Sequence, residues 1–192
     1  MVSNFHVYGL EDSLSASKYP MSVDISDCTP EMSKTVLRLA RADKGSGEDT
    51  FLNGIVVQLD LTASLKMWTQ LQRYHFVDFV SSQSTMHRLT KMDVNKQCNE
   101  YVDSRMIDIL QELITDYKLH PSEEAFLRCI YNIPSGYRLT ARLTTNYRQL
   151  KTIYSQRRLH RLPEWREFCG WIEELPFSGL ITGKPITLEE QK

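Results

Sequence analysis

Residues 139–158, "LTARLTTNYRQLKTIYSQRR", change their apolar period once, and this change predicts a strand that runs directly into a helix. The first apolar side chains alternate with polar ones, as in a strand with one buried face; they are Leu139, Ala141 and Leu143. The later ones recur at helical spacing and lie at Tyr147, Leu150 and Tyr154. Thr144 or Thr145 is placed to cap this helix.

The same part of the chain is basic, although the net charge of the protein is only −1. Residues 138–163 contain seven Lys or Arg and no Asp or Glu. Asn146, Arg148 and Arg157 lie on the strand-to-helix junction and on the helix that follows it. Free backbone N–H groups and the helix dipole favour anions at such a junction. The segment therefore either lines a site for an anion or is an ordinary solvated face.

The composition is that of a soluble globular protein, with 41% apolar and 24% charged residues among 192. This length suits a single domain over residues 1–192. There is no run of eighteen apolar residues and no visible secretion signal. The four cysteines form no CxxC pair, which predicts free thiols in a reducing cytoplasm. The histidines lack metal-ligand spacing, so no metal is expected, and the balanced charge argues against general nucleic-acid coating.

Apolar periodicity and capping signals predict further elements of both types and therefore a mixed α and β fold. They are a helix that Thr29-Pro30 begins, a strand over 54–61, and helices over 62–76, over 102–119 and from Ser122. Residues 81–100 are too polar to assign. Trp165 and Trp171 are expected in a core or an interface, and the polar tail 184–192 is expected to fray.

Two more polar clusters could bind a ligand. The loop Gly45-Ser46-Gly47-Glu48-Asp49-Thr50 could approach a phosphate, but taken alone it is better explained as an ordinary turn. The second cluster combines Gln70-x-x-Arg73-Tyr74-His75 with Ser81-Ser82-Gln83-Ser84 and could hold the phosphate and the base edge of a nucleotide. Taken alone, it is better explained as a polar helix end that continues into a loop.

In order and spacing, these clusters together resemble the flavin-dependent thymidylate synthases, the ThyX family, over residues 45–168. Gly47-Glu48-Asp49-Thr50 occupies the place of that family's first loop, and Gln70, Arg73, Tyr74 and His75 follow at the family's interval. Ser81–Met86 takes the place of its Asn-Glu-Gln-Ser-x-Arg segment. Pro134 precedes Asn146-x-Arg148 by twelve residues, as in the family, and the family's next arginine corresponds to Arg157 or to Arg158.

The resemblance implies an α+β fold with an antiparallel sheet packed against long helices. It implies a homotetramer with FAD and dUMP bound where subunits meet. The implied reaction is reductive methylation of dUMP, or modification of a related pyrimidine nucleotide. Methylenetetrahydrofolate would be the carbon donor, and NADPH would reduce the flavin.

The resemblance also implies roles for individual residues. Those expected to hold the flavin are Thr50, Arg73, His75, Asn146 and Arg148. Those expected to hold the nucleotide are Gln70, Gln83, Ser84 and either Arg157 or Arg158. The catalytic candidates are Ser84, Arg157 and Arg158.

Departures from the family pattern keep two other hypotheses open. The family's Arg-His-Arg motif reads Arg73-Tyr74-His75 here, and Met86 and Ile130 stand where the family has arginines. A non-catalytic nucleotide-binding or interaction protein could keep the scaffold without the chemistry. A nucleic-acid-binding protein could instead use the basic segment 138–163.

Overall fold

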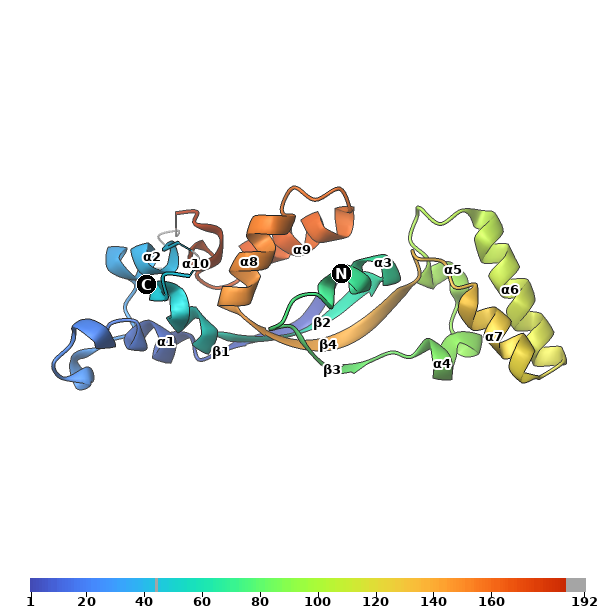
Figure 1. Ribbon diagram of the computed structural model, residues 1–192, viewed down its shortest axis with the longest axis horizontal. Helices are drawn as coiled ribbons and strands as arrows, with labels where there is room; N and C mark the ends of the chain where they lie inside the picture. The colour runs from blue at the N-terminus through green and yellow to red at the C-terminus, as the bar shows by residue number, and fades with distance from the viewer. Residues whose placement is uncertain (44, 186–192) are drawn as a thin grey trace. The chain divides into compact units, whose positions relative to one another are not determined.

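The computed structural model describes residues 1–43 and 45–185. In this part of the chain four strands form one antiparallel sheet in the order β1-β2-β4-β3 (Figure 1). The strands are β1 (Val2–Tyr8), β2 (Val56–Ser64), β3 (Asp78–Ser82) and β4 (Arg138–Asn146). The α+β class with an antiparallel sheet is therefore confirmed.

The alternating pattern in the sequence identifies the two central strands correctly. In β2, the inward side chains of Val57, Leu59 and Leu61 are buried, and their neighbours along the strand are half-buried. The residues of β3 are exposed along its whole length. This lack of a buried face leaves β3 without an alternating apolar pattern in the sequence. Most of the unassigned residues 81–100 lie after β3 and form short helical segments.

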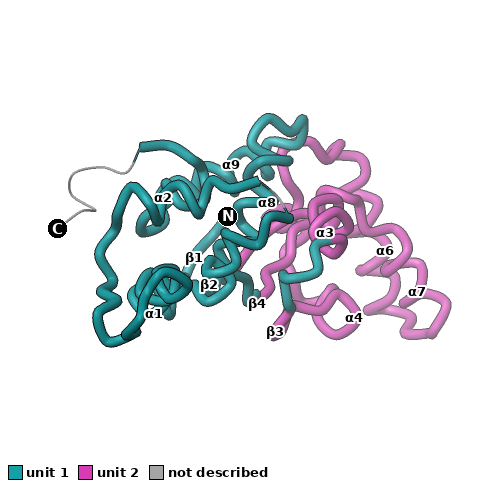
Figure 2. The backbone as a smooth tube through the Cα atoms, turned by 60° about the vertical axis from the view of Figure 1, so that its left-hand side comes forward, with its two compact units in different colours: residues 1–60, 74–78, 143–192 teal, residues 61–73, 79–142 magenta. Residues whose placement is uncertain are grey.

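The described residues divide into two compact units (Figure 2). The first comprises residues 1–60, 74–78 and 143 onward, and the second comprises residues 61–73 and 79–142. Strands β2, β3 and β4 contribute residues to both units. A single domain over residues 1–192 stays a prediction, and most of the tail expected to fray lies outside the described residues.

Helix α8 (Tyr147–Arg157) is the central element of the first unit. It contacts η3 (Glu48–Gly54), α9 (Pro163–Glu173) and α10 (Gly179–Thr182). The unit also contains α1 (Leu10–Ala16), α2 (Lys34–Ala40) and the short 3-10 turns η1 (Tyr19–Met21) and η2 (Ile25–Asp27). Tyr147, Leu150 and Tyr154 are buried on α8, and Trp165 and Trp171 are buried on α9, as expected for core residues.

Helix α2 begins later than the sequence predicts. Ser33, and not Thr29, is its N-cap, and the Ser33 hydroxyl accepts a hydrogen bond from the Val36 N–H at 3.2 Å. The Thr29 hydroxyl and carbonyl instead accept hydrogen bonds from Lys18 Nζ. Both residues are good caps. The helix begins after Ser33 because its apolar residues Val36 and Ala40, which are buried, follow Ser33 directly within the first two turns.

The predicted cap of α8 is also wrong. Strand β4 continues through Thr144 and Thr145, and Asn146 is the N-cap, with its Oδ1 accepting from the Gln149 N–H at 2.8 Å. The Thr145 hydroxyl is buried and donates to the Phe76 carbonyl at 2.7 Å. It therefore has another partner and does not cap the helix.

The second unit is built around a helical hairpin formed by α6 (Ser104–Leu119) and α7 (Glu123–Tyr131). Both helices lie close to the predicted positions, and the Ser122 hydroxyl caps α7. The helix predicted over 62–76 is the shorter α3 (Leu65–Leu71), because β2 extends through Ser64, whose hydroxyl caps α3. Three short helical segments complete the unit: α4 (Thr85–Arg88), η4 (Leu89–Lys91) and α5 (Val94–Gln97). Within residues 1–43 and 45–185, no helix combines the length and apolar character needed to cross a membrane.

Candidate functional site

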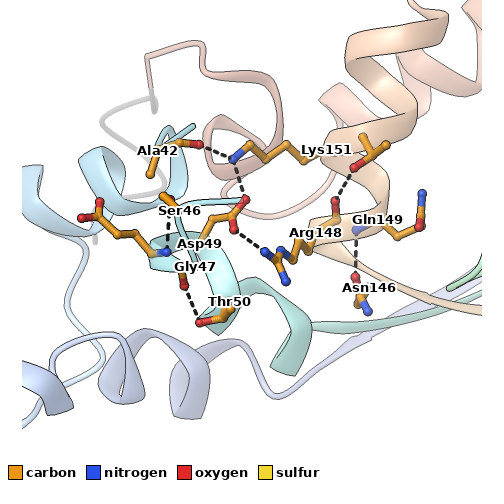
Figure 3. A network of polar contacts seen from close by, with 11 residues as sticks. Ala42, Ser46, Gly47, Asp49, Thr50, Asn146, Arg148, Gln149 and Lys151 are labelled. Atoms are coloured by element: carbon orange, nitrogen blue, oxygen red, sulfur yellow. Dashed lines mark hydrogen bonds and ion pairs between the residues drawn. The ribbon is translucent and has the colours of Figure 1, made fainter. Parts of the chain in front are cut away.

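A buried carboxylate of η3 contacts the start of α8 (Figure 3). Asp49, whose side chain is 6% exposed, pairs through Oδ1 with Arg148 Nη2 at 3.0 Å. Its Oδ2 pairs with Lys151 Nζ at 2.8 Å, and this ammonium also donates to the Ala42 carbonyl at 3.2 Å. One anion thus holds two cations of the basic segment in place.

The turn that leads into η3 contains two glycines in an unusual backbone conformation. Gly45 and Gly47 have φ values of 96° and 82°, which side-chain-bearing residues rarely adopt. The Thr50 hydroxyl donates to the Gly47 carbonyl at 2.8 Å, and the Ser46 hydroxyl accepts from the Glu48 N–H. This bonding is that of an ordinary turn, and its consequence is to place Thr50 next to the Asp49–Arg148 pair.

The first turn of α8 also carries a buried amide. Gln149 is 8% exposed, and its Nε2 finds no hydrogen-bond acceptor within the described residues. A buried donor without an acceptor costs free energy, so such a group commonly indicates a missing partner. Gln149 was not among the residues predicted from the sequence; its position one helical turn after Asn146 is the one local signal that pointed to it.

The C-terminal end of α8 presents two arginines in different surroundings. Arg157 is half-buried: its Nε donates to the Tyr74 hydroxyl at 2.8 Å, and its guanidinium lies 4.8 Å from the centre of the Trp165 ring. Tyr74 in turn donates to Gln156 Oε1 at 2.9 Å. Arg158 is exposed and donates to the Ser155 carbonyl, with the Tyr154 ring 5.9 Å away.

Within the first unit, the predicted residues therefore form two groups. Thr50, Asn146 and Arg148 lie around the start of α8, and Arg157 lies at its end beside Tyr74, which precedes the exposed His75. Arg148 and Arg157 are nine residues apart, or roughly 13 Å along the helix axis. The contacts of Asp49, Lys151 and Tyr74 were not predicted from the sequence.

The other predicted residues lie in the second unit. Gln70 is half-buried in the last turn of α3, and the exposed Arg73 follows the C-cap of that helix. Gln83 extends the pairing of β3, because its N–H donates to the Thr140 carbonyl and its Oε1 accepts from the Thr140 N–H, each at 2.9 Å. Ser84 occupies the N-cap position of α4 without a capping side-chain hydrogen bond.

Several positive side chains of the segment 138–163, which contains no acidic residue, contact residues outside that segment. Arg148 and Lys151 share Asp49, and Arg157 contacts aromatic rings. Arg138 donates to the carbonyls of Lys96 and Cys98. Much of the positive charge is thus engaged in internal contacts and does not form a uniform solvated face.

The four cysteines, all within the described residues, are free thiols, as expected. Burial raises the pKa of Cys98 and of Cys129, and it raises the pKa of Cys169 to about 11. A thiol with a raised pKa carries little thiolate at neutral pH, so these three are poor nucleophiles. In the described ranges, no group of three or more potential metal ligands gathers.

No family model and no curated protein matches the sequence. Among solved structures, the flavin-dependent thymidylate synthase ThyX from Helicobacter pylori, complexed with FAD and dUMP, is similar, with a TM-score of 0.71 and 16% identity. The match covers 94% of this chain and 96% of that chain. The UMP/dUMP methylase PolB from Streptomyces cacaoi, bound with 5-Br dUMP, has a TM-score of 0.58 and 16% identity, covering 90% and 89% of the two chains. This chain therefore has the fold of the flavin-dependent thymidylate synthases, as the resemblance in its sequence implied.

Proposed function

We propose that this protein binds FAD and a pyrimidine nucleotide and catalyses reductive methylation of dUMP or modification of a related pyrimidine nucleotide. The observation that carries the proposal is the fold, which is shared over 94% of the chain with a protein solved with both FAD and dUMP. The donor-rich first turn of α8 supports it independently.

The chemistry of that turn fits a flavin nucleotide. Arg148 is one-third exposed and uses Nη2 on Asp49, which leaves other N–H groups of its guanidinium for a ligand. In the described residues, Asn146 uses its amide oxygen as a cap, which leaves its amide nitrogen for a ligand. FAD offers the matching acceptors in its phosphates and ring carbonyls.

We assign the flavin contacts to Thr50, Arg73, His75, Asn146 and Arg148. When bound, FAD would supply the hydride for the reaction, with NADPH as its reductant and methylenetetrahydrofolate as the carbon donor. Arg148 would contribute a positively charged guanidinium to the flavin, and the ion pair with Asp49 orients this group. The contribution of Asn146 is to present its amide nitrogen at the start of α8, while its amide oxygen accepts from the Gln149 N–H.

We assign the nucleotide contacts to Gln70, Gln83, Ser84 and Arg157. Arg157 is preferred to Arg158 because Tyr74 and Trp165 hold its guanidinium in one position, whereas Arg158 is exposed. A fixed cation stabilises the negative charge that a uracil oxygen gains when the ring is attacked. In this proposal Arg157 and Ser84 remain the catalytic candidates.

The purified chain tests this proposal directly. We expect it to bind FAD in an equimolar ratio and to complement a thymidine auxotroph. With oxygen excluded, the reduced flavin should be oxidised only when dUMP and methylenetetrahydrofolate are added. A colourless protein that binds no added FAD, but whose melting temperature rises with dUMP, would instead favour a non-catalytic nucleotide-binding protein on the same scaffold.

Assembly into a homotetramer, which the resemblance implies, fits the exposed apolar side chains near η1 and η2. Met21 is 93% exposed, and Tyr19, Val23 and Ile25 are exposed beside it. Apolar side chains gathered in this way commonly mark an interaction surface. Sedimentation at micromolar concentration should give the mass of four chains, and a monomer would contradict the assembly.

Replacement of Arg148 by alanine should weaken FAD binding by about tenfold, because one charge-assisted contact is lost. The measurement is a fluorescence titration of FAD. Lys151→Met is the matched control, because it also removes one cation from Asp49 but lies outside the proposed flavin contacts. Equal losses in the two variants would show that the ion-pair network, and not Arg148 itself, determines the affinity.

A further inference from the structure

The first unit contains a cavity of about 370 Å³ on the side of α8 that carries Lys151 and Arg158. Its wall also includes Arg41 at the end of α2 and the residues Leu180–Lys184 of α10 and the segment after it. We propose that this cavity is a second binding site, for a small phosphorylated anion, separate from the proposed flavin and nucleotide contacts.

The charge of the cavity wall supports an anionic ligand. Among the described residues, the lining includes four cationic side chains and no acidic one; the cations are Arg41, Lys151, Arg158 and Lys184. Both lysines already have carboxylate partners behind the wall, because Lys151 pairs with Asp49 and Lys184 pairs with Glu173 at 2.6 Å. Their charges are largely compensated.

The two arginines are not compensated. Within residues 1–43 and 45–185, neither Arg41 nor Arg158 has a carboxylate partner. Arg41 donates to the Lys184 carbonyl at 3.4 Å, and Arg158 donates to the Ser155 carbonyl at 3.1 Å. A guanidinium has five N–H donors, so most donors of both side chains remain available to a ligand in the cavity they share.

A competing explanation is that these cations only balance helix ends. Helices α2, α8 and α10 all end near the cavity, and C-terminal carbonyls attract positive charge. That role would account for the single carbonyl contact of each arginine. It does not account for the number of cations on this one cavity wall. The wall carries two lysines that already have carboxylate partners and, in addition, two arginines that have none among the described residues.

The shape of the donors selects the class of ligand. Guanidinium forks match the oxygen spacing of phosphate groups, whereas a lysine acts as a point charge. The cavity volume lies in the range of small-molecule sites. Leu180, Ile181 and the Tyr154 ring give the wall an apolar part that can hold the organic portion of a phosphate ester.

Asp49 lies between this cavity and the proposed flavin contacts. Its Oδ2 binds Lys151, which lines the cavity, and its Oδ1 binds Arg148, which does not. Arg157 is likewise absent from the lining and contacts Tyr74 and Trp165 instead. The two sites can therefore be altered by different substitutions.

Titration calorimetry of the full chain with inorganic pyrophosphate at low ionic strength tests the proposal. The double variant Arg41→Gln/Arg158→Gln should bind pyrophosphate about tenfold more weakly or not at all. The matched control, Arg38→Gln/Arg161→Gln, removes two exposed positive charges of the same unit that do not line the cavity. We expect its affinity to change by no more than about twofold, because screened surface charges contribute little.

Three results would overturn the proposal. One is that the wild-type chain binds no pyrophosphate, and another is that both double variants lose affinity equally, which would indicate a general charge effect. The third is binding that survives Arg41→Gln/Arg158→Gln but disappears with saturating dUMP, which would place pyrophosphate among the nucleotide contacts. If the chain binds neither FAD nor dUMP, but its pyrophosphate affinity still depends on Arg41 and Arg158, the proposed function fails and the second site stands.

Discussion

Replacing Trp165 with alanine is expected to lower the free energy of unfolding by about 3–5 kcal/mol. Trp165 is 0% exposed, and its ring makes edge contacts with Tyr74 and Phe168 at 6.1 Å between ring centres. Removing it leaves a large cavity in the core of the first unit and also deletes the surface on which the Arg157 guanidinium lies, 4.8 Å from the ring centre. Urea denaturation followed by circular dichroism measures the loss.

Trp165→Phe is the informative companion to this substitution. It keeps an aromatic surface and much of the buried volume, so its loss of stability should be clearly smaller than that of Trp165→Ala. The two variants also separate packing from the positioning of Arg157, because the phenylalanine variant folds while offering the guanidinium a smaller ring. A loss below about 1 kcal/mol for Trp165→Ala would contradict the central place of this residue in the core.

Asp49→Asn should be the second strongly destabilising substitution, at about 2–3 kcal/mol. The side chain of Asp49 is 6% exposed and bridges Arg148 and Lys151, which are 33% and 24% exposed. Removing one partner of a fully buried ion pair costs roughly 3–5 kcal/mol, and the partial exposure of the two cations reduces this cost. For a chain of this size, the melting temperature should fall by on the order of 4–10 °C.

Glu48→Gln is the matched control for Asp49→Asn, because it neutralises the adjacent but exposed carboxylate. Its melting temperature should stay close to that of the wild-type protein. Combining Asp49→Asn with Lys151→Met should recover part of the lost stability, because one uncompensated cation is then removed. If the two losses simply added, Asp49 and Lys151 would not be coupled as their 2.8 Å contact indicates.

Predictions from the apolar spacing of three stretches were confirmed. The alternation in 54–61, the strand-to-helix change in 139–158 and the helical spacing in 102–119 place β2, β4 with α8, and α6. These patterns work because each element must bury one face, and the spacing of apolar residues records which face it is. The order and spacing of the polar clusters also indicated the correct fold, because together they resemble a known family. None of the clusters indicates that fold when taken alone.

Choices between equivalent local signals were decided by tertiary contacts. Thr29 and Ser33 are both capable N-caps, and Lys18 binds the oxygens of Thr29 while Ser33 caps the helix. Thr145 could have capped α8, but its hydroxyl donates to the Phe76 carbonyl, 69 residues away in sequence. A competing partner at that separation leaves no trace in the local sequence.

By itself the sequence determined the main strands and helices with a clear apolar spacing, the faces that these elements bury and the position of the basic segment, because these depend on residue type and spacing. The tertiary structure alone decided what the positive charges contact. Lys151 meets Asp49 across 102 residues, and Arg157 meets Tyr74 across 83. Only folding brings such pairs together and removes them from water, and burial is what makes a carboxylate or a hydroxyl an effective partner for a cation.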